Sequence, residues 1–252
     1  MSEPSAYLDL FSRQAAEYAK SRPTYPTALF DALATLATRR ETAWDCATGN
    51  GQAAAGLAPH FHTVVATDAS AEQIRHAAGP PNVRFRVATA EQSSLPANSL
   101  DVVTVAQALH WLDHDRFYPE VRRVTATGGL FAAWSYGACH AGDDLEGALR
   151  EFEDGLLGAY WHPNRHWVDE GYRTIPFPFP EVEMPPFELR MRWSLSQLGG
   201  YLGSWSAVAN YRRARRVDPV APFVERIVKL WGSPEDTREI VWPLALRVGR
   251  LE

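Results

Sequence analysis

The chain has 252 residues, of which 46 % are hydrophobic and 22 % charged, and this composition predicts one globular domain with a large insertion. The net charge of −5 and the pI near 5.9 argue against a protein that binds nucleic acid through phosphate contacts. Two cysteines make no disulfide framework. The N-terminus has no secretory pattern, and no apolar run approaches the roughly 20 residues of a membrane span. We therefore expect a cytoplasmic protein without a membrane partner.

Helical spacing of apolar residues predicts a first helix over residues 6–20 and a second from Pro26 to about Thr38. Between them, the segment Arg22-Pro23-Thr24-Tyr25-Pro26 ends the first helix, because proline cannot continue it.

A glycine loop follows. A short apolar run from Ala43 reaches Asp45, passes through Gly49 and Gly51, and continues into an alanine-rich segment typical of a helix. Glycines let the backbone turn tightly and approach a ligand closely, and a helix N-terminus offers unpaired N–H groups. Gly49-x-Gly51-x-x-Ala54 also fits the dinucleotide fingerprint. An NAD-type Rossmann oxidoreductase is therefore one alternative, and a simple tight turn is another.

The residues Asp45-Cys-Ala-Thr-Gly-Asn-Gly51 resemble the acid-x-Gly-x-Gly-x-Gly loop of class I S-adenosylmethionine-dependent methyltransferases, with Ala47 in place of the first glycine. The resemblance implies S-adenosylmethionine as cofactor and S-adenosylhomocysteine as product. No metal is expected, because His162 and His166 have no nearby Cys or third His to complete a zinc site. It implies Asp45 near the cationic amino-acid end of the cofactor, and Gly49 and Gly51 along its carboxylate and ribose side. The other loop residues expected at the cofactor are Ala47, Thr48 and Gln52.

The phrase from Tyr18 to Pro26 resembles the N-terminal segment of small-molecule methyltransferases related to trans-aconitate methyltransferase. That resemblance implies a lid over the cofactor, formed by residues 1–26, with Arg22 and Tyr25 at the cofactor. The alternative is a helix-terminating turn with Tyr25 packed on the core.

A β-rich run over residues 63–67 ends at Asp68, which lies 17 residues beyond Gly51. This is close to the offset of an acid that accepts hydrogen bonds from both ribose hydroxyls. Ser70 is predicted to cap a helix, with Gln73 in a capping-box position. Ala69, Ser70 and Gln73 are expected beside Asp68 in the cofactor site.

A third strand is predicted over residues 83–88, and Ala90-Glu91 after it resembles the adenine-contact position of the family. The β-branched run over residues 102–105 predicts a buried fourth strand, typical of a parallel sheet. Asp101, just before it, is interpreted as a strand-edge acid rather than a catalytic group.

The fourth strand ends in Ala106-Gln-Ala-Leu-His-Trp111, which places Gln107, His110 and Trp111 together. In an open α/β sheet, ligands bind at the carboxyl ends of the strands. The segment resembles the one that borders the methionine end of the cofactor and the substrate in this methyltransferase branch. His110 is the candidate catalytic residue, and three roles stay open: a general base, a hydrogen-bond donor to the substrate, or a structural residue at a helix start.

A helix is predicted over residues 115–125, with Pro119 limiting it or falling in its first turn, and a fifth strand over residues 128–134. Residues 187–193 and 238–250 alternate like strands, and Pro243 makes the second an edge or bulged strand. These elements predict a doubly wound α/β fold. The resemblance implies a Rossmann-like seven-stranded sheet of order 3-2-1-4-5-7-6.

We expect a single methyltransferase domain over residues 1–252. Its core spans about residues 38–136, 176–193 and 236–250, and a helical cap spans about 138–175 and 194–232. The cap is rich in aromatic residues, which suit an apolar pocket for a small acceptor, although for any single aromatic residue a packed helical lobe is the favoured interpretation. The residues expected in the substrate pocket are Trp134, Tyr136, Trp161, Trp205 and Tyr211.

The densest basic cluster, residues 211–216, is typical of a solvated helix face, but one of its arginines in the pocket would pair with an acceptor carboxylate. The prediction is methyl transfer to a small acceptor, at a carboxylate or hydroxyl oxygen, and the basic cluster suggests that this acceptor is anionic. A monomer or weak homodimer without a nucleic-acid partner is expected. A non-catalytic protein that binds S-adenosylmethionine is the remaining alternative.

Overall fold

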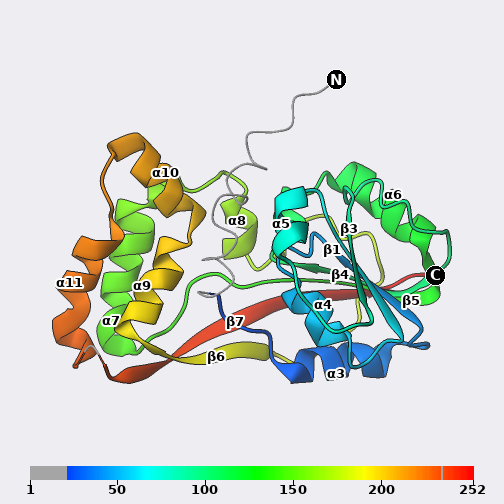
Figure 1. Cartoon of the computed structure of the whole chain (residues 1–252), viewed down its shortest axis with the longest axis horizontal. Coiled ribbons are helices and arrows are strands. Elements are labelled where there is room, and N and C mark those ends of the chain that lie inside the picture. The colour runs from blue at the N-terminus through cyan, green and yellow to red at the C-terminus, as the bar shows by residue number, and fades with distance from the viewer. Residues whose placement is uncertain (1–21, 234) are drawn as a thin grey trace. The chain divides into compact units, whose positions relative to one another are not determined.

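The computed structural model describes residues 22–233 and 235–252 (Figure 1). The helix expected over residues 6–20 and most of the expected lid lie outside these residues. The elements, in chain order, are α3 (Thr27–Leu36), β1 (Thr42–Cys46), α4 (Gln52–Leu57), β2 (Thr63–Asp68), α5 (Ala71–His76), β3 (Val83–Val87), β4 (Leu100–Ala106), η1 (Leu109–Trp111), α6 (His114–Val124), β5 (Thr125–Ser135), α7 (Asp143–Arg150), η2 (Glu151–Leu156), η3 (Gly158–Tyr160), α8 (Arg165–Asp169), β6 (Phe187–Ser194), α9 (Leu195–Gly203), α10 (Ser206–Arg215), α11 (Val220–Trp231) and β7 (Thr237–Arg250).

The strands form one seven-stranded sheet of order β3-β2-β1-β4-β5-β7-β6, which confirms the expected order. Strands β1 to β5 pair in parallel, and β7 pairs with β5 in the antiparallel direction. Strand β4 is buried along nearly its whole length, as expected for a β-branched run at the centre of a parallel sheet.

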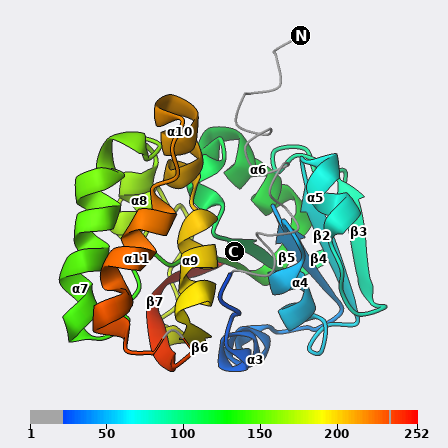
Figure 2. The same cartoon turned by 60° about the vertical axis from the view of Figure 1, so that its left-hand side comes forward.

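Helices α4 and α6 cover opposite faces of this sheet (Figures 1 and 2). The side chain of Asp45 in β1 accepts the backbone N–H of Ala54 in α4. The ring of Trp44, one residue earlier, packs edge-on against Phe117 of α6 at 6.3 Å. Successive side chains of a strand point to opposite faces, so these two contacts belong to the two sides of the sheet.

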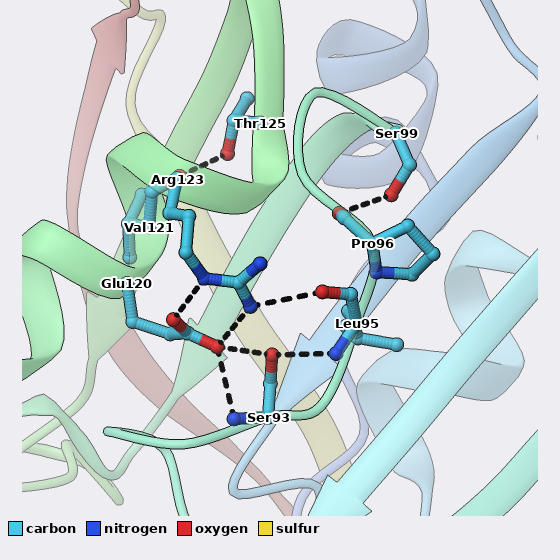
Figure 3. A network of polar contacts seen from close by, with 8 residues as sticks. All are labelled: Ser93, Leu95, Pro96, Ser99, Glu120, Val121, Arg123 and Thr125. Atoms are coloured by element: carbon cyan, nitrogen blue, oxygen red, sulfur yellow. Dashed lines mark hydrogen bonds and ion pairs between the residues drawn. The ribbon is translucent and has the colours of Figure 1, made fainter.

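Pro119 lies inside α6, so the prediction that it limits the helix or falls in its first turn was wrong. Proline removes one helical hydrogen bond, but tertiary contacts of the helix offset this loss. Glu120 accepts the backbone N–H and hydroxyl of Ser93 and pairs with Arg123, which also donates to the carbonyl of Leu95 (Figure 3). This network ties α6 to the loop before β4.

Pro243 does not mark an edge strand, because β7 lies between β5 and β6 in the sheet. The pairing of β7 with β5 begins at Ala245, two residues after Pro243. The missing N–H of the proline therefore falls outside the part of β7 that pairs with β5.

The chain divides into two compact units. Of the described residues, 25–137, 166–188 and 243–252 form the sheet unit, and 22–24, 138–165 and 189–242 form the helical unit. Residues 166–175, expected in the cap, belong to the sheet unit. Inside the helical unit, Trp242 donates to the hydroxyl of Tyr201, and Phe152 stacks on Phe223 at 4.3 Å. Within residues 22–233 and 235–252, no helix has the length and apolar character needed to cross a membrane.

Candidate functional site

Several expected site residues of the sheet unit lie at one edge of the sheet. Strands β1, β2, β4 and β5 are parallel, and Cys46 is level with Thr67 on one side and Val105 on the other. Ala106 is in turn level with Trp134. The carboxyl ends of these strands therefore meet, and the glycine loop, Asp68 and the residues after β4 follow them there.

The glycine loop joins β1 to α4 through three residues with positive φ: Ala47 at 56°, Gly49 at 55° and Gly51 at 92°. Ala47 adopts the left-handed conformation that a glycine would adopt more easily, in the position where the methyltransferase pattern has one. A Cβ at Gly51 would lie 2.9 Å from the ring of Phe85 and 3.0 Å from the carbonyl oxygen of Ala78. Packing within the protein thus requires glycine at position 51.

Asp45 supports the glycine loop from inside. Its carboxylate is fully buried and accepts three hydrogen bonds, from the hydroxyls of Thr48 (2.5 Å) and Thr104 (2.9 Å) and from the N–H of Ala54 (3.0 Å). Burial raises the pKa of Asp45 to about 6, although these hydrogen bonds lower it. A contact between Asp45 and the cofactor stays a prediction, and the contacts of its side chain connect β1, β4 and α4.

Asp68 joins the glycine loop to α5. One carboxylate oxygen accepts the N–H of Gly49 at 2.9 Å, and the other accepts the N–H of Ser70 at 2.8 Å. Burial raises the pKa of Asp68, and the two backbone hydrogen bonds oppose this rise. Ser70 caps α5 by accepting the N–H of Gln73, as its sequence position predicts. Each oxygen of Asp68 keeps a second acceptor site, so the ribose contact stays a prediction that the geometry accommodates.

Ala90 and Glu91 follow β3 in a short turn, closed by a bridge between Thr89 and Gln92. Ala90 is buried, and the carboxylate of Glu91 accepts the N–H of Asp113 at 3.4 Å. No contact of these residues tests the adenine assignment, which stays a prediction.

Gln107 ties the ends of β4 and β5 together. Its side chain donates to the carbonyl of Tyr136 at 2.9 Å and accepts the N–H of the same residue at 3.1 Å. Its own N–H donates to the carbonyl of Trp134, and its φ is 56°. Gln107 therefore shapes this edge of the sheet, whatever contact it makes with a ligand.

His110 is buried in η1, and its Nδ1 lies 2.8 Å from the hydroxyl of Tyr172. The ring of Trp111 lies 4.6 Å from the imidazole. Tyr172 is fully buried and has a φ of 61°. Burial raises the pKa of Tyr172 well above its usual value, so its phenol is protonated at neutral pH.

The residues expected in the substrate pocket fall into two groups. Trp134 and Tyr136 belong to the sheet unit, where both are buried and the rings of Tyr25 and Trp134 lie 5.5 Å apart. Trp161, Trp205 and Tyr211 belong to the helical unit. There Trp161 lies 5.4 Å from Trp205, and Tyr211 lies 4.9 Å from Tyr160. Their role as pocket residues stays a prediction.

The arginines expected near the site lie in the helical unit. Arg22 donates to the carbonyl of Ser204 at 3.3 Å and lies over the ring of Tyr201. In the basic cluster, Arg212 pairs with Asp218 at 2.7 Å, and Arg215 donates to the hydroxyl of Tyr160 at 2.7 Å. These contacts explain the cluster as part of the surface of α10, and its pairing with an acceptor carboxylate stays a prediction.

Sequence reasoning missed two residues of the site, Thr104 and Tyr172. Thr104 is a hydroxyl inside an otherwise apolar strand, and that polar position was a signal that it has a buried partner. Tyr172 lies 62 residues from His110 in a segment without regular spacing, so the sequence carried no signal for their contact.

Comparisons with known proteins show the family to which the chain belongs. The family described as "Methyltransferase domain" matches residues 44–133, which span the glycine loop and β1 to β5. A structure from Anaeromyxobacter dehalogenans, named as a candidate type II methyltransferase, is 45 % identical, covers 91 % of this chain and 97 % of its own, and has a TM-score of 0.85. An uncharacterized methyltransferase of Mycobacterium tuberculosis is 35 % identical over 176 residues, 69 % of this chain and 67 % of that protein.

A Dictyostelium discoideum protein, also named as a candidate methyltransferase, is 28 % identical over 242 residues, 94 % of this chain and 92 % of its own. The chain belongs to the class I S-adenosylmethionine-dependent methyltransferases. Neither the NAD-type oxidoreductase nor the non-catalytic binding protein is favoured by these relatives.

Proposed function

We propose that the chain transfers a methyl group from S-adenosylmethionine to an oxygen of a small anionic molecule, in the branch that resembles trans-aconitate methyltransferase. The position of His110 carries this proposal. It follows β4 at the sheet edge that also holds the glycine loop, and its imidazole is held by Tyr172. Asp45 and Asp68, by contrast, are engaged by hydrogen bonds that support the loop itself.

The glycine loop fits the cofactor. A Cβ at Gly49 would meet no atom of the described residues within 4 Å, so a ligand can approach the backbone there. Asp68, beside it, has acceptor sites left for the ribose hydroxyls. Gly49 and Asp68 would therefore hold S-adenosylmethionine, while Gly51 and Asp45 keep the loop in shape from within.

When bound, S-adenosylmethionine supplies a methyl group on a positively charged sulfonium, which is already electrophilic. The protein's contribution is to orient the acceptor oxygen in line with that methyl group and to exclude water. A carboxylate acceptor is ionised at neutral pH and needs no base, whereas a hydroxyl would need one. In either case His110 would contact the acceptor through its ring.

An acceptor panel tests the proposal. Small mono-, di- and tricarboxylic acids, trans-aconitate among them, would be incubated with methyl-labelled S-adenosylmethionine, each beside its alcohol and amine analogue. We expect label on an acid or alcohol oxygen, and mild base would hydrolyse a labelled methyl ester and release the label as methanol. Label confined to amines, or none on any compound, would contradict the proposal.

A further inference from the structure

The C-terminal end of α10 concentrates positive charge on the surface of the helical unit. Helix α10 lies at one end of that unit (Figures 1 and 2). Four of the five residues 212–216 are arginines, and three of these arginines are exposed together with the residue that follows them. We call these four exposed residues, Arg213, Arg215, Arg216 and Val217, the basic tip.

Within the described residues, no acidic group pairs with the three arginines of the basic tip. Arg213 reaches the amide oxygen of Asn210 at 3.5 Å, and Arg215 donates to the hydroxyl of Tyr160 at 2.7 Å, so both partners are neutral. Helices α9 and η3, which pack against α10, contain no charged residue. The positive charge of the basic tip is therefore exposed to water without a compensating carboxylate.

Asp218 fixes the turn that displays Val217. Its carboxylate pairs with Arg212 at 2.7 Å and accepts the backbone N–H of Val220 at 3.3 Å. The acid of this turn is thus committed to the fourth arginine and to the turn itself. Val217 is 56 % exposed, so the turn holds an apolar side chain in water beside three cations.

The backbone of Arg216 shows that helix stability alone does not explain the cluster. Cations in the last turn stabilise a helix through its dipole, and this effect accounts for Arg212, Arg213 and Arg215. Arg216 lies just beyond that turn with a φ of 60°, in the left-handed region where helices most often place a glycine. The chain therefore carries a cation at a position where the backbone favours glycine.

We propose that the basic tip binds the surface of a membrane that contains anionic lipids. Guanidinium groups make two-point contacts with phosphate oxygens, and an apolar side chain beside them enters the headgroup region. An acidic protein segment would use the three cations but would leave the exposed Val217 without a role. This contact needs no spanning helix, so it revises the expectation of no membrane partner, which rested on the absence of a spanning run. It does not depend on the proposed function.

Co-sedimentation of the whole chain with lipid vesicles tests the proposal. We expect binding to vesicles of equal parts phosphatidylglycerol and phosphatidylcholine, binding at least tenfold weaker to phosphatidylcholine alone, and release as salt is added. Arg213→Gln with Arg216→Gln should weaken binding to the mixed vesicles about 25-fold, because each cation near an anionic surface contributes about fivefold. The matched control is Arg150→Gln with Arg226→Gln, which removes two exposed cations of the same unit that each pair with a glutamate. It should leave binding within about twofold.

Two single variants separate binding from folding and lipid from protein. Glycine suits a φ of 60°, so Arg216→Gly should unfold at the same urea concentration as the wild type or a higher one, while its vesicle binding falls about fivefold. Val217→Ser should weaken vesicle binding severalfold without changing any binding to poly-L-glutamate.

Equal binding of the wild type to both kinds of vesicle, or binding to neither, would overturn the proposal. Unchanged vesicle binding in the folded Arg213→Gln, Arg216→Gln protein would do the same, as would an equal loss in the control. Binding to poly-L-glutamate without binding to the vesicles would assign the basic tip to an acidic protein instead.

Discussion

Ala47, Gly49 and Gly51 share a left-handed backbone, but a side chain would meet different surroundings at each. Ala47 shows that this loop accepts an alanine at a φ of 56°. Gly49 has almost the same φ and open space around it, whereas a Cβ at Gly51 would collide with Phe85 and with the backbone of Ala78. We therefore expect position 49 to require glycine for ligand binding and position 51 to require glycine for folding.

We predict that Gly49→Ala folds with a loss of about 1 kcal/mol but binds S-adenosylhomocysteine at least tenfold more weakly, because its methyl group enters the space left for the cofactor. Gly51→Ala should lose about 1–3 kcal/mol through overpacking. Urea unfolding and calorimetric titration of both variants measure the two effects. Unchanged affinity in a folded Gly49→Ala protein would exclude this backbone from the cofactor site.

At the residue scale, the sequence predicted the positions where strands end but not the partners found there. Asp45, Asp68 and His110 were recognised because each follows a predicted strand. The hydrogen bond of Asp45 to Thr104 joins residues 59 apart, and that of His110 to Tyr172 joins residues 62 apart. Such contacts depend on tertiary packing, which local spacing does not encode.

Helix α6 offers a pH-dependent test at the scale of one element. The side chain of Glu120 is 9 % exposed, and hydrogen bonds from Arg123 and Ser93 lower its pKa from 4.5 to about 2 (Figure 3). At pH values between about 2 and 4.5, Glu120 is protonated in the unfolded chain but ionised in the folded chain. The free energy of unfolding should therefore fall as the pH falls through this window.

We predict that Glu120→Gln lowers the free energy of unfolding by about 1–2 kcal/mol at neutral pH. This loss is smaller than the pKa shift alone would give, because the Arg123 side chain is 43 % exposed and water screens the ion pair. The difference from wild type should shrink as the pH falls from 4.5 toward 2. Urea unfolding at a series of pH values measures it. Glu146→Gln, which removes an exposed pair with Arg150, should cost less than about 0.5 kcal/mol. Equal losses in both variants at all pH values would refute this account.

The element boundaries that the sequence predicted less well involve proline. Local propensity suggests that Pro119 ends or begins a helix, but α6 continues through it with Phe117, Val121 and Val124 buried. Pro243 suggested an edge or bulged strand, and the edge position is excluded because β7 has neighbours on both sides. In α6 tertiary burial outweighs the local preference of the backbone, whereas Pro243 is exposed and lies outside the part of β7 that pairs with β5.

At the scale of the whole molecule, the observed strand order confirms the predicted one. The prediction came from the resemblance and from the alternating strands late in the chain. The limits of the two units were harder to foresee. Two of these limits fall at Leu189 and Pro243, inside β6 and β7, where the strand pattern continues without a break. Composition marks linkers between domains, but it does not mark a limit inside a strand.

The central claim is that the sheet edge formed by the glycine loop and Asp68 binds S-adenosylmethionine. Asp68→Ala removes an acceptor for Gly49 and for the expected ribose contact. Glu72→Ala, in the neighbouring helix α5, removes a carboxylate that pairs with Arg75 and His76 and serves as the control.

Calorimetric titration with S-adenosylhomocysteine, and in parallel with NAD, tests this claim most directly. We expect saturable binding of S-adenosylhomocysteine to the wild type and to Glu72→Ala, binding weakened by about 1.5–3 kcal/mol in Asp68→Ala, and no heat of binding with NAD. Binding of NAD without S-adenosylhomocysteine, or unchanged S-adenosylhomocysteine affinity in a folded Asp68→Ala protein, would contradict the account.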